Sequence, residues 1–85
     1  MKIFHTDTFS SELKLLPLPV RKLYKKQESL FLLNWKDPRL HTKKLRKNNY
    51  IFSFRVTRRY RVLFLFRDER TVFFTSIGHR KDIYE

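Results

Sequence analysis

The sequence predicts an α+β fold, in which an N-terminal helical hairpin packs on one face of a small, twisted antiparallel sheet. Two patterns predict it. In the first half of the chain apolar residues recur at helical spacing, and in the second half they alternate with polar or cationic residues through three runs. The length of 85 residues allows one domain only, so residues 1–85 are expected to form a single unit.

The composition is strongly basic. Twenty Lys and Arg stand against eight Asp and Glu, which gives a formal net charge of +12. Such a charge attracts polyanions, and the release of counterions from phosphates favours the binding of nucleic acid. An acidic protein partner would suit the same positive charge. No apolar run approaches the roughly 20 residues of a membrane span, and the N-terminus lacks the apolar core of a signal peptide. The chain is therefore expected to stay in the cytoplasm, away from membranes.

The first helix is predicted to begin after a short apolar run at residues 2–5, which is either a first strand or the lead into the helix. Thr8 is the expected N-cap, and Pro17 ends the helix. Pro19 lies where the first turn of a second helix tolerates proline. The second helix presents an apolar stripe made of Val20, Leu23, Tyr24, Leu30 and Phe31.

The second half begins with a basic loop at residues 40–49, in which Leu45 is the expected apolar anchor. Three strands follow. The first places Phe52, Phe54 and Val56 on one face, and the second runs over residues 60–67 with the same alternation. A turn at residues 68–70 leads into the last strand at residues 71–77.

The first hairpin decides where two arginines lie. If its turn centres on Arg58, Val56 pairs with Tyr60, and Arg55 lies opposite Arg61 on the face away from the helices. Like charges directly opposite each other destabilise a sheet by roughly a fraction of a kcal/mol. An anion between them would relieve the repulsion, and the guanidinium fork fits phosphate oxygens. Alternatively, both side chains extend into solvent or pair with the acidic residues at 68 and 69. A shift of one residue in register would place the two arginines on opposite faces.

The C-terminal segment adds candidates for proton transfer. His79 is an imidazole among several cations, and Tyr84 offers either a ring for stacking on a base or a phenolic proton. Asp82 can orient His79 or pair with Arg80. The simpler alternatives are that the histidine is a turn residue and that the tyrosine only packs.

Other kinds of site find no support in the sequence. There is no cysteine, His5 and His41 show no metal-ligand spacing with a carboxylate, and no metal or cofactor is expected. Gly78 is the only glycine, which excludes a glycine-rich phosphate loop. An enzyme made from this sequence would use Arg, Lys, His and Tyr. That set suits metal-free RNA cleavage, in which a base activates the 2′-hydroxyl and cations stabilise the phosphorane.

Three segments together resemble the RelE/ParE superfamily of toxins from type II toxin–antitoxin systems: residues 43–46 (KKLR), 60–64 (YRVLF) and 77–84 (IGHRKDIY). The resemblance covers nearly the whole chain. It implies a compact α+β fold and an acidic cognate antitoxin as partner. RelE-like members are metal-independent endoribonucleases that cut mRNA in the ribosomal A site and so inhibit translation.

The resemblance also implies roles for single residues. Arg61 and Arg80 match arginines that contact the scissile phosphate, and Tyr84 matches a tyrosine that stacks or acts as a base. His79 matches a histidine of some members, and Arg55 matches a basic strand position. The basic residues around them are expected to bind RNA, namely Lys43, Lys44, Arg46, Lys47, Arg58, Arg59 and Lys81.

One departure concerns the general base. RelE itself has two lysines on the strand before the Tyr-Arg pair, where this chain has Phe52 and Phe54. Arg55, Lys43 or Lys44 are the possible replacements. His79 is the first choice for the base because the lysine pair is missing.

Two other functions remain open. ParE-like members share the fold, inhibit DNA gyrase and lack the catalytic set, so the joint presence of Arg61, His79, Arg80 and Tyr84 favours the nuclease branch. A non-catalytic member that binds only RNA or its antitoxin is the second alternative.

Overall fold

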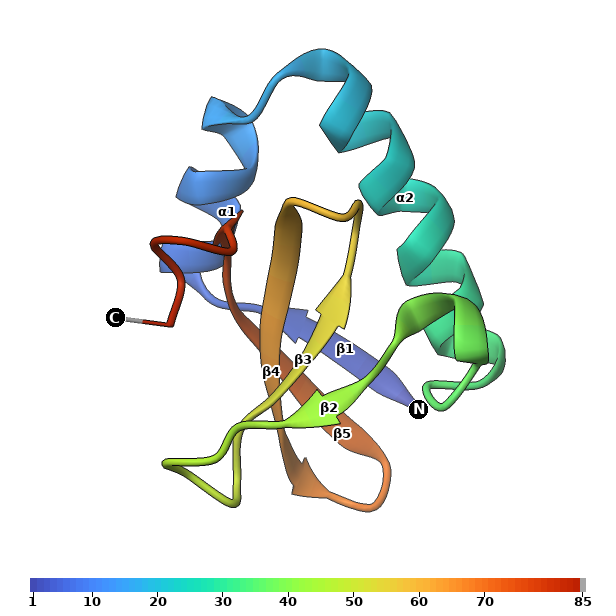
Figure 1. Cartoon of the computed structure of the whole chain (residues 1–85). Helices are drawn as coiled ribbons and strands as arrows, with labels where there is room; N and C mark the ends of the chain where they lie inside the picture. The colour runs from blue at the N-terminus through green and yellow to red at the C-terminus, as the bar shows by residue number, and fades with distance from the viewer. Residues whose placement is uncertain (85) are drawn as a thin grey trace.

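The structure is a computed structural model that describes residues 1–84 (Figure 1). Two helices and a five-stranded sheet make one unit, and the sheet has the strand order β1-β5-β4-β3-β2. The predicted α+β class is confirmed. The elements in chain order are β1 (Lys2–His5), α1 (Asp7–Leu15), α2 (Leu18–Leu33), the short 3-10 helix η1 (Pro38–Leu40), β2 (Lys43–Lys44), β3 (Phe52–Arg55), β4 (Tyr60–Asp68) and β5 (Thr71–His79).

The direction of one strand corrects the prediction. β1 runs parallel to β5, with Lys2 opposite Thr71 and His5 opposite Phe74, whereas the other neighbouring strands are antiparallel. The sheet is therefore mixed rather than purely antiparallel. Parallel neighbours need a long crossover, and here both helices and three further strands separate β1 from β5 in the chain. No residue pattern within a four-residue strand records its direction.

The start of α1 also differs from the prediction. Thr6, rather than Thr8, caps the helix: its Oγ1 accepts a hydrogen bond from the Phe9 amide at 3.1 Å. The same hydroxyl donates to the Thr75 carbonyl at 3.1 Å, and the Thr6 amide donates to the Phe74 carbonyl. Thr6 therefore turns the chain from β1 into α1 while it holds both against β5.

The core lies between the helices and one face of the sheet. Figure 1 shows α1 and α2 diverging from their junction above the strands. Phe31 of α2 is fully buried, and its ring centroid lies 5.4 Å from Phe54, 4.9 Å from Phe64 and 5.1 Å from Phe74. Phe9 of α1 packs on Phe74 of the same sheet face. These aromatic contacts stabilise a small chain that has no disulfide.

The apolar stripe of α2 is narrower than predicted. Tyr24 and Phe31 are buried, but Leu23 is 44% exposed. Gln27 takes an inward position instead, where its Nε2 donates to the carbonyls of Arg39 at 3.2 Å and Arg55 at 2.8 Å. This amide holds η1 and the end of β3 against α2.

The basic segment at residues 40–49 contains a strand that was expected to be loop. Lys43 and Lys44 form the edge strand β2, opposite Ser53 and Phe52 of β3. The buried anchor is Leu40, at the end of η1, whereas Leu45 is only partly buried. This strand could not be predicted from alternating polar and apolar residues, because an edge strand of two residues is too short to show such a pattern.

Candidate functional site

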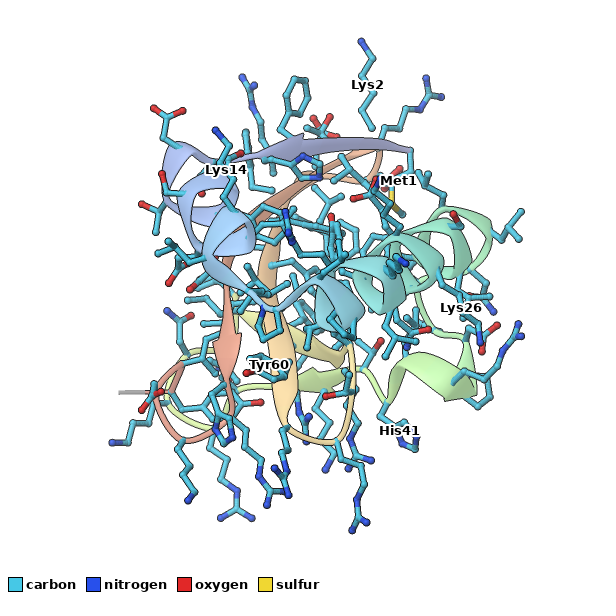
Figure 2. The ribbon with its side chains drawn as sticks, turned by 90° about the horizontal axis from the view of Figure 1, so that it is seen from above. Met1, Lys2, Lys14, Lys26, His41 and Tyr60 are labelled. Carbon is cyan, nitrogen blue, oxygen red and sulfur yellow. The ribbon has the colours of Figure 1, made fainter. Side chains whose placement is uncertain are left out.

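A cationic cleft opens on the sheet face that the helices do not cover. Its volume is about 490 Å³. Five of the lining residues carry a positive charge, and within residues 1–84 none of the lining is acidic, so the cleft fits a polyanion. The lining residues are His41, Lys43, Ser53, Arg55, Arg61, Arg80, Lys81 and Tyr84. Figure 2 shows nitrogen-tipped side chains gathered along the edge of the molecule where His41 is labelled.

The hairpin between β3 and β4 positions two of these cations. Arg55 pairs with Arg61 across the strands, so the predicted register is confirmed. The Thr57 hydroxyl fixes the turn by accepting hydrogen bonds from the amides of Arg59 at 3.1 Å and Tyr60 at 3.2 Å. Because Phe54 and Val62, one residue earlier and later, point into the core, both arginines face the cleft.

Arg61 is held more rigidly than a surface arginine. Its side chain is only 9% exposed, and Nη1 donates to the carbonyls of Thr57 at 2.8 Å, Arg58 at 2.7 Å and Tyr60 at 3.3 Å. Burial lowers the pKa of the guanidinium from its ordinary value, while the nearby Tyr84 hydroxyl acts in the opposite direction. Because these carbonyls hold Nη1, the guanidinium is a fixed cation in the lining of the cleft.

The C-terminal segment folds back to complete the cleft. The Arg80 amide donates to the Arg59 carbonyl at 2.7 Å, and the amides of Asp82 and Ile83 turn back to the His79 carbonyl. This turn carries Tyr84 to β3, where its hydroxyl donates to Ser53 Oγ at 3.3 Å. Residues distant in sequence therefore meet on one surface.

His79, the first choice for the general base, lies outside the cleft lining. It pairs with Tyr60, whose ring packs on the core side of the sheet, and the two rings meet edge-on at 5.5 Å. Its Nδ1 accepts the Lys81 amide at 3.1 Å. A register shift between Leu63 and Phe64 changes which residues of β5 face the cleft. Across the shift the buried positions pass from Phe74 to Ile77, so Gly78 lies opposite Arg61 and His79 lies opposite Tyr60.

The structure thus brings together Arg55, Arg61, Arg80 and Tyr84 of the predicted catalytic residues, with Lys43 and Lys81 beside them. The other predicted RNA-binding residues are exposed but lie beyond the cleft lining. Lys44 borders a neighbouring hollow of about 370 Å³. Arg46 and Lys47 follow β2, and Arg58 and Arg59 occupy the β3–β4 turn.

Two lining residues were missed in the sequence. Ser53 carries no signal of its own, but its position between Phe52 and Phe54 places it on the cleft face. His41 was considered only as a metal ligand, although it follows an Asp-Pro turn that begins a short helix. Its backbone, at φ 50° and ψ 47°, is the only left-handed non-glycine conformation in residues 1–84. Within the same residues no cluster of three or more metal-binding side chains occurs, and no helix is long and apolar enough to cross a membrane.

No family model matches the sequence, and no curated protein sequence is significantly similar to it. Solved structures are similar over nearly the entire chain. A chain of the RelB–RelE antitoxin–toxin complex from Methanococcus jannaschii is 25% identical, with a TM-score of 0.77 over 96% of this chain and 95% of that one. YafQ from Escherichia coli BL21(DE3) is 13% identical, with a TM-score of 0.80 over 99% and 98% of the two chains.

The chain has the RelE/ParE toxin fold. A YoeB/ParE toxin from Agrobacterium tumefaciens extends the similarity, with 9% identity and a TM-score of 0.79 over 94% of this chain and 99% of that one. Within the RelE/ParE fold, the similarity is to the toxin component of toxin–antitoxin pairs.

Proposed function

We propose that the chain is the toxin of a type II toxin–antitoxin system and that it is a metal-independent, ribosome-dependent mRNA endoribonuclease. The observation that carries the proposal is the cleft in which Arg55 and the fixed Arg61 face each other, with Arg80 beside them and no acidic side chain from the described part of the chain in the lining. In the proposed reaction the 2′-hydroxyl attacks the adjacent phosphate. Cleavage then stops translation of the cut message.

The arginines supply the electrostatic part of this mechanism. Attack of the 2′-oxygen concentrates negative charge on the phosphorane oxygens, and donors fixed in advance stabilise that charge without reorganising. Arg61 is such a donor because three carbonyls fix its guanidinium. Arg55 and Arg80 add charge from either side, and the half-exposed Tyr84 ring offers a surface on which a base can stack.

The proposed partners follow from charge and from the structural neighbours. The E. coli YafQ neighbours include a DinJ–YafQ toxin–antitoxin complex, and the net charge of +12 suits an acidic antitoxin. The other proposed partners are mRNA and the ribosomal A site. In this proposal the activity is cytoplasmic and needs no cofactor.

The test is inducible expression followed by mapping of mRNA 5′ ends in translating cells. Arg80→Ala is the preferred variant, since Arg80 is exposed and its side chain supports no turn. The matched control is Arg70→Ala, which removes the same charge from the β4–β5 turn. We expect cuts inside translated codons with the wild type and with Arg70→Ala, and their loss with Arg80→Ala at equal protein level. In vitro cleavage of a translation complex should persist when EDTA removes free metal.

Two outcomes would contradict the proposal. Growth arrest with intact mRNA and inhibited DNA supercoiling would indicate a gyrase inhibitor. The absence of growth arrest, together with retained RNA or antitoxin binding, would indicate a non-catalytic member.

A further inference from the structure

The cleft needs a group that accepts a proton, and most of its lining cannot do so. Arginine and lysine side chains are cationic near neutral pH and carry no free lone pair. The Tyr84 hydroxyl donates its proton to Ser53 Oγ. His79 lies outside the lining and its Nδ1 accepts the Lys81 amide. Of the lining residues within 1–84, His41 is the one with an imidazole, a side chain that can both give and take a proton.

The backbone of His41 gives a second, independent observation. The residue follows η1 in the left-handed conformation, and its amide donates to the Pro38 carbonyl at 3.2 Å. Glycine or asparagine would adopt this conformation with less strain. Strained backbone of this kind concentrates at functional sites. The His41 side chain lines the cleft, and Figure 2 labels it near the edge where nitrogen-tipped side chains gather.

The charges around His41 come from both of the hollows that it borders. The carboxylate of Asp37 is already used, since it accepts hydrogen bonds from Arg39 Nε at 3.1 Å and Nη2 at 2.8 Å. Among residues 1–84, no other acidic residue lines either hollow. The cations that line them are Lys43, Arg55, Arg61, Arg80 and Lys81 in the cleft, and Lys36 and Lys44 in the neighbouring hollow.

We propose that His41 is the general base of the cleft, an inference that rests on the proposed nuclease function. Its neutral imidazole takes the proton of the 2′-hydroxyl as the 2′-oxygen bonds to phosphorus. The bond from phosphorus to the 5′-oxygen breaks, and that oxygen takes a proton from solvent. The products are a 2′,3′-cyclic phosphate and a 5′-hydroxyl end, so no oxidant, metal or co-reactant enters the step.

The test measures single-turnover cleavage of an mRNA in a stalled translation complex as a function of pH. His41→Asn keeps a residue that tolerates the left-handed backbone and removes the imidazole, and His41→Gly removes the strain as well. We expect both variants to lose about 100-fold or more in rate, the range typical of a missing general base. The wild-type rate should rise with pH and then level off, as general-base catalysis requires, and this dependence should be absent from both variants. Added imidazole should partly restore cleavage by His41→Gly.

Binding separates chemistry from positioning. A translation complex that carries a 2′-deoxy substitution at the cleavage site binds but does not react. Its dissociation constant should change less than about threefold between the wild type and His41→Asn, because a general base contributes to the barrier more than to binding. Arg70→Ala should match the wild type in both rate and binding.

Different results overturn different claims. If the wild type cleaves and His41→Asn cleaves at a similar rate with the same pH profile, the role of His41 is wrong and the nuclease function stands. His79→Gln tests the competing assignment, and a loss there with full activity in His41→Asn would transfer the role to His79. If the wild type itself cleaves nothing, the nuclease function fails and the proposal for His41 fails with it.

Discussion

Arg55 and Arg61 face each other across β3 and β4, two like charges in directly opposed positions of one sheet. Within residues 1–84, the carbonyls of Thr57, Arg58 and Tyr60 compensate the charge of Arg61, and the Arg55 side chain has no such partner. Arg55 adds to the repulsion and lowers the pKa of the Arg61 guanidinium, although less than burial does. The fold therefore keeps a charge pair that is unfavourable in the absence of an anion.

Removal of Arg55 should stabilise the free protein and weaken its binding to RNA. Arg55→Gln abolishes the repulsion, and we expect the free energy of unfolding to rise by about 0.2–1 kcal/mol at low salt. The gain should shrink at high salt because mobile ions already screen the pair. Urea denaturation at two salt concentrations measures it, with Arg67→Gln as the exposed control. A loss of stability in Arg55→Gln would show that the opposed charges are not a cost to the fold.

Substitution of Arg61 should damage the fold as well as the activity. Arg61→Ala leaves three carbonyls of a tight turn without their charged donor, and we expect a loss of about 1–3 kcal/mol in the free energy of unfolding. Arg61→Lys keeps the charge but lacks the planar fork, so it should recover only part of this loss. Arg80→Ala, at an exposed position, should change stability by less than about 0.5 kcal/mol. Chemical denaturation of the three variants separates the two roles of Arg61, and equal stability of all three would refute its structural role.

Thr6 and Thr8 should differ sharply although they are only two residues apart. Thr6→Ala removes the N-cap of α1 and the link to the Thr75 carbonyl, and we expect a loss of about 1–2 kcal/mol. Thr8 is exposed in the first turn, and Thr8→Ala should stay within about 0.5 kcal/mol of the wild type. Thermal and urea unfolding of the pair provides the comparison. A larger loss of stability in Thr8→Ala than in Thr6→Ala would mean that Thr8 caps α1, as the sequence pattern predicts.

Alkaline pH should weaken the fold through Tyr24. Burial, with a smaller effect of the hydrogen bond to Glu28, raises the pKa of Tyr24 well above its usual 10.0. Because the folded pKa exceeds the unfolded one, the stabilisation is complete below about pH 10 and is lost as the pH rises toward the folded pKa. The difference in unfolding free energy between the wild type and Tyr24→Phe should therefore shrink above pH 10. Tyr50→Phe, at an 81% exposed position, is the control and should show no such change.

The sheet was predictable from the sequence because long strands carry a clear period. Phe52 and Phe54 alternate with Ser53 and Arg55, and β4 continues the pattern, so the turn at Arg58 set both the register and the facing arginines. The apolar positions of α2 were predictable for the same reason. Leu23 is the exception, since it is exposed. Gln27 is buried instead, because η1 and β3 offer carbonyls to its amide.

What escaped prediction depends on contacts between distant segments. The parallel pairing of β1 and the capping role of Thr6 both require β5, which lies more than sixty residues further along the chain. The position of His79 depends on an irregularity in β5 that no local pattern marks. His41 lines the cleft because of its place directly after η1. The sequence around a single histidine after a proline turn does not show which way its side chain faces.

The pairing of the first strand with the last also governs how the protein folds. Helices α1 and α2 precede β3, β4 and β5 in the chain, and β1 gains its neighbour in the sheet only when β5 is complete. Such distant contacts favour slow, cooperative folding, in which the long loop between them is closed late. The cations of the cleft come from segments that meet in the same event, namely β2, the β3–β4 hairpin and residues 80–84. Partly folded chains therefore have no assembled cleft, and the activity of the protein should appear in one step with its native structure.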